Sequence, residues 1–400
     1  MSLSRQPRIV DGNRIKLLKN GAEFFPALVT SIDAATSEVR LETYIFRDDV
    51  AGISIADALK RAARRGVKIQ VLIDGVGSHS TPDAFFVAMQ RTGIEVLVFR
   101  PEREFFNIKQ SRLRRVHRKI ALIDGKVGFV GGINLIDDMT ECLSEFPRYD
   151  YAVQVEGPVL ADIYLAMVQL WRTVSWWKFG RHRAGIPLPD FPRHVPGALI
   201  HESEAGNTKV LFAVRDNFRH RRDIERAYLA AISASRREVL LTSPYFLPGR
   251  HFRRALIEAA QRGVRVTLLL QGRADHVLLQ QATRALYTQL LGAGVTIFEY
   301  HKSMLHGKVA MVDCRWATVG SSNLDPFSMF LNREANVVVI DDTFAAMLRA
   351  SVMEEIGLNA SKLEPMNWQK RGWLARMSAW MAYGFARWVM GWLGFGKRWD

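Results

Sequence analysis

Cysteine is almost absent from this chain of 400 residues, which contains only Cys142 and Cys314. Two cysteines without metal-site spacing exclude a disulfide framework and a cysteine-based metal centre. The N-terminal stretch MSLSRQPRIVDGNRIKLL has no apolar core segment, so we expect no signal peptide there. Acidic residues are also scarce, because 55 Lys and Arg stand against 40 Asp and Glu, giving a formal charge of +15. A chain this basic is expected to meet an anionic partner, either nucleic acid or an anionic membrane surface.

What is present is an internal repeat. The segment ALKRAARRGVKIQVLIDG (58–75) matches ALIEAAQRGVRVTLLLQG (255–272), and each reads as an amphipathic helix, a glycine and a buried strand. Upstream, EVRLETYIF (38–46) matches EVLLTSPYF (238–246), and downstream TGIEVLVF (92–99) matches AGVTIFEY (293–300). Alternation of strand and helix is typical of βαβ units. We therefore predict two α/β halves related by pseudo-symmetry.

The domain organisation follows from this repeat. We expect an N-terminal half at residues 1–180, a Pro- and Gly-rich linker at 181–207 and a C-terminal half at 208–360, followed by a tail at 361–400. A length of 400 residues with 48% hydrophobic and 24% charged residues suits two such halves, each with its own core.

Within the repeat, the pattern His-x-Lys-x4-Asp occurs twice, as His117, Lys119 and Asp124 and again as His306, Lys308 and Asp313. Each copy begins a predicted hairpin, at 117–132 and at 306–321. Side chains two residues apart on a strand share a face about 6.5–7 Å apart, so each His and Lys can address one phosphate. The two aspartates fall at strand ends or turns, where we expect them to hold the structure or a partner residue rather than attack substrate.

Further polar residues accompany each motif. Asn134 and Asn323 follow Gly-containing turns and can donate hydrogen bonds to phosphate oxygens, as can Ser321. Asp150 lies 33 residues after His117, and Glu334 lies 28 after His306. Either carboxylate can accept a proton from an imidazole Nδ1 and leave Nε2 free for chemistry.

These residues predict one composite active site, at the interface of the two halves, for phosphodiester chemistry. No metal-ligand cluster is visible and no cofactor is implied, so the lysines and asparagines are expected to supply the positive clamp. One histidine would attack phosphorus and the other would protonate the leaving oxygen, then deprotonate the acceptor. Because the sequence is symmetric, the choice is open; we expect His117 as nucleophile and His306 as acid and base.

At these motifs the chain resembles the phospholipase D superfamily, and within it the shorter bacterial cardiolipin synthases of the B type. The resemblance extends over roughly residues 10 to 360. It is carried by LLKNGAEFFPALVTSI, LETYIFRDDVAG, RRVHRKIALIDGKVGFVGGINL, DYAVQVEGP, HGKVAMVDCRWATVGSSNLDP and LNREANVVV. It implies a phospholipase D-like α/β sandwich in each half and gives catalytic roles to all six residues of the two His-x-Lys-x4-Asp motifs. The first copy departs by having Gly132 where the second has a serine.

The resemblance also implies an activity, which is phosphatidyl transfer from phosphatidylglycerol or phosphatidylethanolamine to phosphatidylglycerol, forming cardiolipin. Water as the acceptor would instead make a phospholipase D that yields phosphatidic acid, and the motifs do not separate the two. A nucleic-acid phosphodiesterase is a further alternative that the positive charge would serve, and a non-catalytic lipid-binding protein is another. The oligomeric state is left open.

The tail favours a membrane partner over nucleic acid. Six of the ten tryptophans lie between Trp368 and Trp399, and no acidic residue occurs between Glu364 and Asp400. Tryptophan with basic residues is typical of a segment lying in the interface of an anionic leaflet. We expect an in-plane helix, with a packed core helix or a true span as alternatives, and a peripheral protein on the cytoplasmic face of the bacterial membrane. The arginines of 109–119 are expected to form a phosphate funnel at the site mouth.

Overall fold

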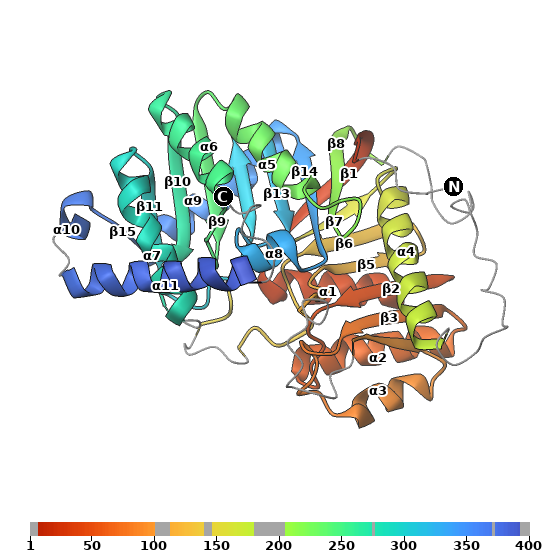
Figure 1. The fold of residues 1–400 in the computed structure, drawn as a ribbon. Coiled ribbons are helices and arrows are strands. Elements are labelled where there is room, and N and C mark those ends of the chain that lie inside the picture. The colour runs from red at the N-terminus through yellow and green to blue at the C-terminus, as the bar shows by residue number, and fades with distance from the viewer. Residues whose placement is uncertain are drawn as a thin grey trace.

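Strands from both halves form one sheet of fifteen strands, in the order β15-β11-β10-β9-β12-β13-β14-β8-β1-β7-β6-β5-β2-β3-β4 (Figure 1). A computed structural model describes residues 7–100, 113–139, 146–179, 205–273, 277–369 and 373–392. From the two central strands outward, β1-β7-β6-β5-β2-β3-β4 mirrors β8-β14-β13-β12-β9-β10-β11. The predicted pair of pseudo-symmetric α/β halves is therefore confirmed.

The first half contains seven strands and four helices among its described residues. In chain order they are β1 (Ile9–Lys19), α1 (Asn20–Asp33), β2 (Glu38–Thr43), α2 (Val50–Arg64), β3 (Lys68–Asp74), α3 (Asp83–Gln90), β4 (Glu95–Phe99), β5 (Lys119–Ile123), β6 (Val127–Gly131), β7 (Tyr151–Glu156) and α4 (Leu160–Phe179). The strands β2, β3 and β4 pair in parallel, as the βαβ pattern requires, whereas β5, β6 and β7 form antiparallel ladders.

The second half repeats this plan. Its elements are β8 (Thr208–Arg215), α5 (Asp223–Ala234), β9 (Glu238–Ser243), α6 (Arg250–Gln261), β10 (Arg265–Gln271), α7 (Val277–Gly292), β11 (Thr296–Tyr300), β12 (Val309–Val312), β13 (Trp316–Gly320), α8 (Pro326–Phe330), β14 (Glu334–Ile340) and α9 (Asp342–Asn359). After these come β15 (Ala360–Lys362), α10 (Pro365–Gln369) and α11 (Trp373–Trp392). Of the expected linker at 181–207, all but the last three residues lie outside the described ranges.

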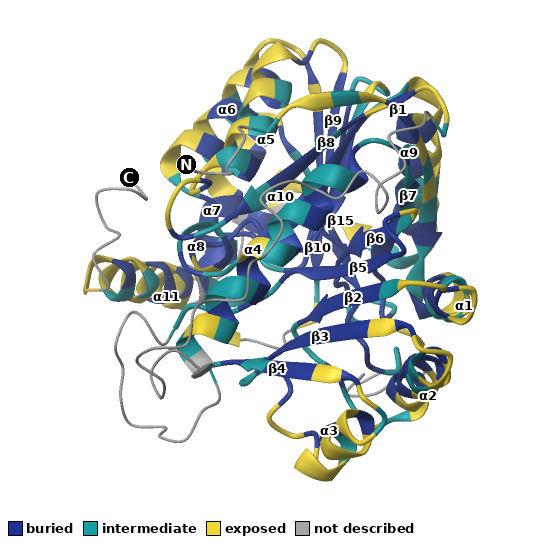
Figure 2. Ribbon diagram, turned by 90° about the vertical axis from the view of Figure 1, so that its right-hand side faces the viewer, coloured by how far each residue is buried: buried dark blue, intermediate teal, exposed yellow. Residues whose placement is uncertain are grey.

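The halves are joined by backbone pairing and by a shared core. The strand β1 pairs antiparallel with β8, with Ile9 opposite Leu211, which the repeat alone did not predict. One hydrophobic cluster contains Ile163 and Met167 of α4 together with Leu348 and Val352 of α9. Figure 2 shows the strands buried between helices whose outer faces are exposed. Because this cluster contains side chains of both halves, their relative placement is fixed by packing.

The aspartates of the two motifs hold the start of a neighbouring strand. Asp124, immediately after β5, accepts hydrogen bonds from the backbone N–H groups of residues 36, 37 and 38 and from the hydroxyls of Thr36 and Ser37. Asp313, after β12, accepts the backbone N–H groups of residues 236 to 238 in the same way. Both have φ near +50°, 52° and 54° respectively, a conformation that Asp tolerates in tight turns. Each carboxylate therefore holds the backbone of a neighbouring strand, at the far end of its own strand from the lysine, while the catalytic role that the resemblance implies for both aspartates stays a prediction.

Candidate active site

Two short backbone pairings bring the histidines of the two halves to one place. The backbone N–H of His117 donates to the carbonyl of Arg333 at 2.9 Å, and that of His306 donates to the carbonyl of Tyr149 at 2.8 Å. Isolated parallel bridges between Val116 and Arg333 and between Tyr149 and Leu305 accompany these bonds. Each histidine is therefore held against the segment that precedes β14 or β7 of the opposite half.

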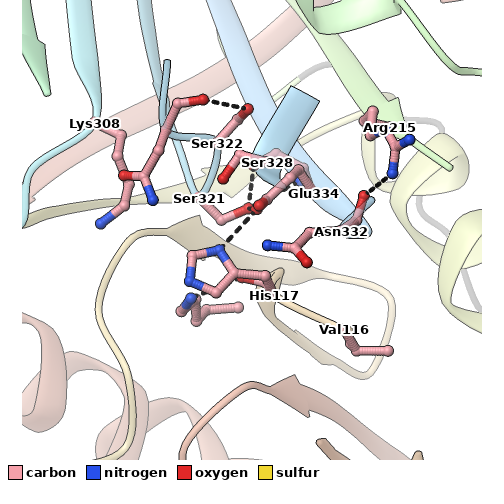
Figure 3. A network of polar contacts seen from close by, with 12 residues as sticks. Val116, His117, Arg215, Lys308, Ser321, Ser322, Ser328, Asn332 and Glu334 are labelled. Atoms are coloured by element: carbon pink, nitrogen blue, oxygen red, sulfur yellow. Dashed lines mark hydrogen bonds and ion pairs between the residues drawn. The ribbon is translucent and has the colours of Figure 1, made fainter. Parts of the chain in front are cut away.

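The carboxylates are consequently paired across the halves. His117 Nδ1 lies 3.0 Å from Glu334 Oε2, and His306 Nδ1 lies 2.5 Å from Asp150 Oδ2. Figure 3 shows the His117 ring directed at Glu334, with Ser321 on the other side of that carboxylate. Both carboxylates are almost fully buried, so each is positioned to accept the Nδ1 proton and leave Nε2 for substrate.

Both imidazoles line a single cavity of about 610 Å³. Asn134 and Asn323 line it as well, which gives the cavity a polar floor with one histidine and one asparagine from each half. Apolar side chains line it too, and they include Leu247, Leu278, Leu279, Met304, Phe327, Phe385, Val389 and Met390. A cavity lined by both polar and apolar side chains matches an amphiphilic ligand.

The two lysines lie behind this floor and are not among the residues that line the cavity. Lys119 Nζ donates to the carbonyl of His117 at 2.7 Å, and Lys308 Nζ donates to the carbonyl of His306. Burial, together with the charge of Lys308, lowers the pKa of Lys119 to about 7. Burial lowers the pKa of Lys308 to about 8, although Asp150 opposes this shift. A bound anion would favour the charged form of both lysines and so raise their pKa values again.

Ser321, which was predicted to bind phosphate, lies against Glu334. Its hydroxyl is fully buried and donates to Glu334 Oε2 at 2.5 Å, and it accepts the backbone N–H of Ala335 at 3.0 Å. Ser321 is not among the residues that line the cavity, and its hydroxyl supports Glu334, so its predicted contact with phosphate stays a prediction. In the first half the equivalent residue is Gly132, where a Cβ would collide with the carboxylate of Asp150. The difference between the copies thus follows from the closer approach of that carboxylate.

The two histidine–carboxylate pairs differ electrostatically. Burial disfavours the charge of Glu334, but His117, Lys119 and Ser321 outweigh it and lower the pKa of this carboxyl. Burial raises the pKa of Asp150 to about 7 against the pull of Lys308. Burial also lowers the pKa of His117, and lowers that of His306 further with help from Lys308 and Arg148. The His117–Glu334 pair is therefore neutral imidazole with ionised carboxylate, whereas the His306–Asp150 pair holds one shared proton up to about pH 7.

The predicted phosphate funnel is only partly present. Arg115 lines the catalytic cavity. Arg118 instead is buried, and its guanidinium donates to Glu42 Oε1 at 2.9 Å and to the carbonyl of Ala166 at 3.1 Å. Arg112 lies outside the described residues. Because alternate residues of an extended segment face opposite ways, only part of this basic stretch can reach the site.

Sequence reasoning missed three residues at this cavity. Tyr44 packs its ring edge-on against His117, with centroids 5.0 Å apart. Arg148 lines the cavity two residues before Asp150. Asp325 also lines it, while its carboxylate caps α8 by accepting the backbone N–H of Phe327 at 2.7 Å. Their place in the segments flanking the motifs was the available signal, but it did not distinguish them from structural residues.

The tail forms a helix that packs on the second half. In α11, Ala379, Ala382, Tyr383 and Met390 are buried in the same cluster as α7. None of the described helices has the combination of length and hydropathy that a bilayer span needs. In the described ranges, His, Cys, Asp and Glu side chains form no group of three or more suited to a metal ion.

Known proteins are similar to this chain in sequence and in fold. The family model described as "Cardiolipin synthase, PLD-like domain" matches residues 28–161 and 228–355, one match in each half. Cardiolipin synthase B of Salmonella typhimurium is 39% identical over 390 residues, which cover 96% of this chain and 91% of that protein. Cardiolipin synthase B of Escherichia coli strain K12 is 37% identical with the same coverage. A crystal structure of phosphatidylserine synthase from Haemophilus influenzae shares the fold, with a TM-score of 0.69, 15% identity and coverage of 96% and 95%.

Two matched domains, each with a complete His-x-Lys-x4-Asp motif, define a phospholipase D-like protein with one composite site. The chain belongs to the family of phospholipase D-like cardiolipin synthases.

Proposed function

We propose that this protein is a phosphatidyltransferase that makes cardiolipin, moving a phosphatidyl group from phosphatidylglycerol or phosphatidylethanolamine to a hydroxyl of phosphatidylglycerol. The observation that carries the proposal is the cavity with His117 and His306 at its floor, each hydrogen-bonded to a carboxylate from the opposite half. Relatives named cardiolipin synthase B, 37–39% identical over nearly the whole chain, support the choice of reaction.

In the first step, His117 Nε2 attacks phosphorus while Glu334 holds the Nδ1 proton and compensates the imidazolium charge that forms. The bond from phosphorus to the headgroup oxygen breaks, and His306 Nε2 gives that oxygen its proton, releasing glycerol or ethanolamine. The proton shared by His306 and Asp150 at neutral pH suits this pair to the acid role. His117, neutral beside an ionised carboxylate, suits the nucleophilic role.

In the second step, His306 removes the proton from the acceptor hydroxyl, whose oxygen attacks the phosphohistidine. The phosphorus–nitrogen bond breaks, and His117 returns to its neutral form. Asn134 and Asn323 donate hydrogen bonds to the phosphoryl oxygens, and Lys119 and Lys308 add positive charge from behind.

Transfer succeeds over hydrolysis only if water is kept from the phosphohistidine. The apolar residues that line the cavity, Leu279 and Met390 among them, are suited to exclude water while they hold the acyl chains of the lipid. Substrates of this kind reside in a bilayer, so we propose that the protein acts as a peripheral protein at the cytoplasmic face of the membrane. Its charge of +15 favours anionic lipid there.

The test is incubation of the purified protein with phosphatidylglycerol vesicles, with and without phosphatidylethanolamine, followed by thin-layer chromatography. We expect cardiolipin with glycerol, and dependence on phosphatidylethanolamine would identify the donor. Phosphatidic acid as the sole product would establish a hydrolase. Plasmid cleavage that disappears in His117→Ala would favour the nuclease alternative.

The histidine roles are tested with a phosphodiester that carries a p-nitrophenolate leaving group, which departs without an acid. His306→Ala should then accumulate a phosphohistidine at position 117, detected by mass spectrometry of the peptide. Accumulation on His306 in His117→Ala would reverse the assignment.

A further inference from the structure

The C-terminal helix α11 has one packed face and one exposed apolar face. Ala379, Tyr383 and Met390 are buried against α7. The other face exposes seven large apolar side chains, which are Trp373, Met377, Trp380, Met381, Phe385, Trp388 and Trp392. Apart from the adjacent Trp380 and Met381 they are spaced by three or four residues, so they form one stripe along the helix. We call this surface the aromatic stripe.

A stripe of this kind is unusual on a protein surface. Of the large apolar residues that are exposed in the described ranges, one third lie on this single helix, 7 of 21. Single exposed apolar residues need no explanation, but a contiguous row marks a contact surface. Tryptophan in particular prefers the boundary between water and hydrocarbon, because its ring is apolar and its N–H is polar.

The stripe is continuous with the catalytic cavity. Phe385 belongs to the stripe, is 50% exposed and also lines the cavity. Leu278 of α7 and Phe327 of α8 are likewise exposed, at 52% and 44%, and line the same cavity. These three side chains, from three helices, form what we call the apolar rim. Leu279 and Val389 line the cavity as well and are less exposed than these three residues, so they extend its apolar lining inward from the rim.

We propose that the aromatic stripe lies in the interface of a phospholipid bilayer and that the apolar rim is the passage by which lipid enters the cavity. The headgroup moves toward His117 and His306, while the acyl chains cross the rim without meeting water. This inference rests on the proposed function for the identity of the lipid, but bilayer docking by the stripe can be measured without it.

A bilayer fits this surface better than a second protein. Its hydrocarbon leads through the rim to the cavity, whereas a protein covering the stripe would close the cavity mouth at Phe385. Exposed Arg387 follows Phe385 and precedes Trp388 in the sequence, which places it at the edge of the stripe and suits a negatively charged leaflet. The overall charge of +15 acts in the same direction.

The first experiment compares Trp380→Ser/Trp388→Ser with a matched control. Trp176 on α4 is 55% exposed, close to the 57% of Trp380, and α4 lies well apart from α11 in Figure 1. Sedimentation with phosphatidylglycerol–phosphatidylethanolamine vesicles should fall about tenfold or more for the double variant, since two large aromatic anchors are lost. Trp176→Ser should sediment as the wild type does. Wild-type sedimentation of the double variant would refute docking by the stripe.

The second experiment separates docking from folding and from catalysis. Turnover is measured on vesicles and on short-chain phosphatidylglycerol dispersed below its micellar concentration. The ratio of vesicle to dispersed turnover should fall about tenfold in the stripe variant, in proportion to the binding loss. Equal losses on both substrates would mean a structural role. If wild-type protein sediments through the stripe but makes no cardiolipin, the proposed function fails while the docking surface stands.

The third experiment tests the rim through Leu278→Asn/Phe327→Asn. Polar groups at the rim should admit water, so the ratio of phosphatidic acid to cardiolipin should rise about tenfold while vesicle sedimentation stays near wild type. An unchanged product ratio would refute the passage. Gel filtration of the wild type and of Trp380→Ser/Trp388→Ser tests whether the stripe instead binds a second copy of the chain. A wild-type dimer that the substitutions dissociate, with vesicle binding unaffected, would refute docking on the bilayer and assign the stripe to that second copy.

Discussion

Replacing Asp150 by Asn is the most direct test of the crossed pairing, in which each histidine meets the carboxylate of the opposite half. The substitution preserves the shape of the side chain and removes one charge. The wild-type carboxylate accepts the Nδ1 proton of His306 at 2.5 Å. A hydrogen bond to a charged group contributes roughly 1.5–3 kcal/mol. At about 1.36 kcal/mol per tenfold in rate, its loss should reduce the turnover number roughly 10- to 150-fold. If the new NH₂ group faces Nδ1, the imidazole takes the wrong tautomer and the loss is larger.

The same substitution should change how turnover and stability depend on pH. Burial raises the pKa of Asp150 to about 7, so the proton that it shares with His306 is lost as pH rises through that value. Wild-type turnover should therefore decline above about pH 7, and Asp150→Asn should lack this limb. A carboxyl whose pKa is raised on folding costs stability as pH rises from about 4 to about 7, by up to about 4 kcal/mol for a shift of this size. The stability of Asp150→Asn relative to wild type should rise over that interval, measured by thermal unfolding.

A double-mutant cycle supplies the refutation. Thermal unfolding of Asp150→Asn, His306→Ala and the double variant should give a coupling energy of about 1.5–3 kcal/mol. The cycle of Asp150→Asn with His117→Ala is the control and should be additive to within about 0.5 kcal/mol. Coupling to His117 in place of His306 would show that the carboxylates serve their own halves, and the crossed arrangement would be wrong.

Three further substitutions have defined outcomes. Asp124→Asn should destabilise the fold by about 1–3 kcal/mol in urea unfolding at pH 7, because its carboxylate accepts five hydrogen bonds. Burial opposes the charge, but the backbone N–H groups of residues 38 and 36 lower the pKa of Asp124. The difference from wild type should therefore shrink progressively as pH falls below about 4, the ordinary pKa of Asp, and a constant difference would contradict this. Gly132→Ser should abolish transfer by displacing Asp150, while circular dichroism shows a folded protein. Ser321→Ala should slow turnover about tenfold by removing one hydrogen bond from Glu334, and an unchanged rate would deny that support.

Much of the fold was predictable because the two halves show the same hydrophobic periodicity. The paired strands β2–β3–β4 and β9–β10–β11 follow from the matched segments, and the hairpins follow from apolar alternation around Asp124 and Asp313. The pairing of β1 with β8 could not be predicted this way. Periodicity indicates that a strand exists, whereas its partner across a sheet depends on the packing of the whole molecule.

The site was predictable as a set of residues but not as a set of contacts. Asp150 and Glu334 were identified from their positions after the histidines, but the separations of 33 and 28 residues do not say which imidazole each carboxylate meets. Backbone bridges between segments 217 and 156 residues apart decide that. The contact between Ser321 and Glu334 was not predicted for a similar reason, since only the structure shows that this hydroxyl points at Glu334.

The exchange of carboxylates between the repeats has a consequence for how this enzyme can vary. Neither half contains both members of a histidine–carboxylate pair. One half alone would therefore need a second copy to form a complete site. Substitutions in one half are constrained by the other half, because a shift at Asp150 disables the histidine that lies 156 residues later in the chain. The two halves therefore have to vary together, as one unit.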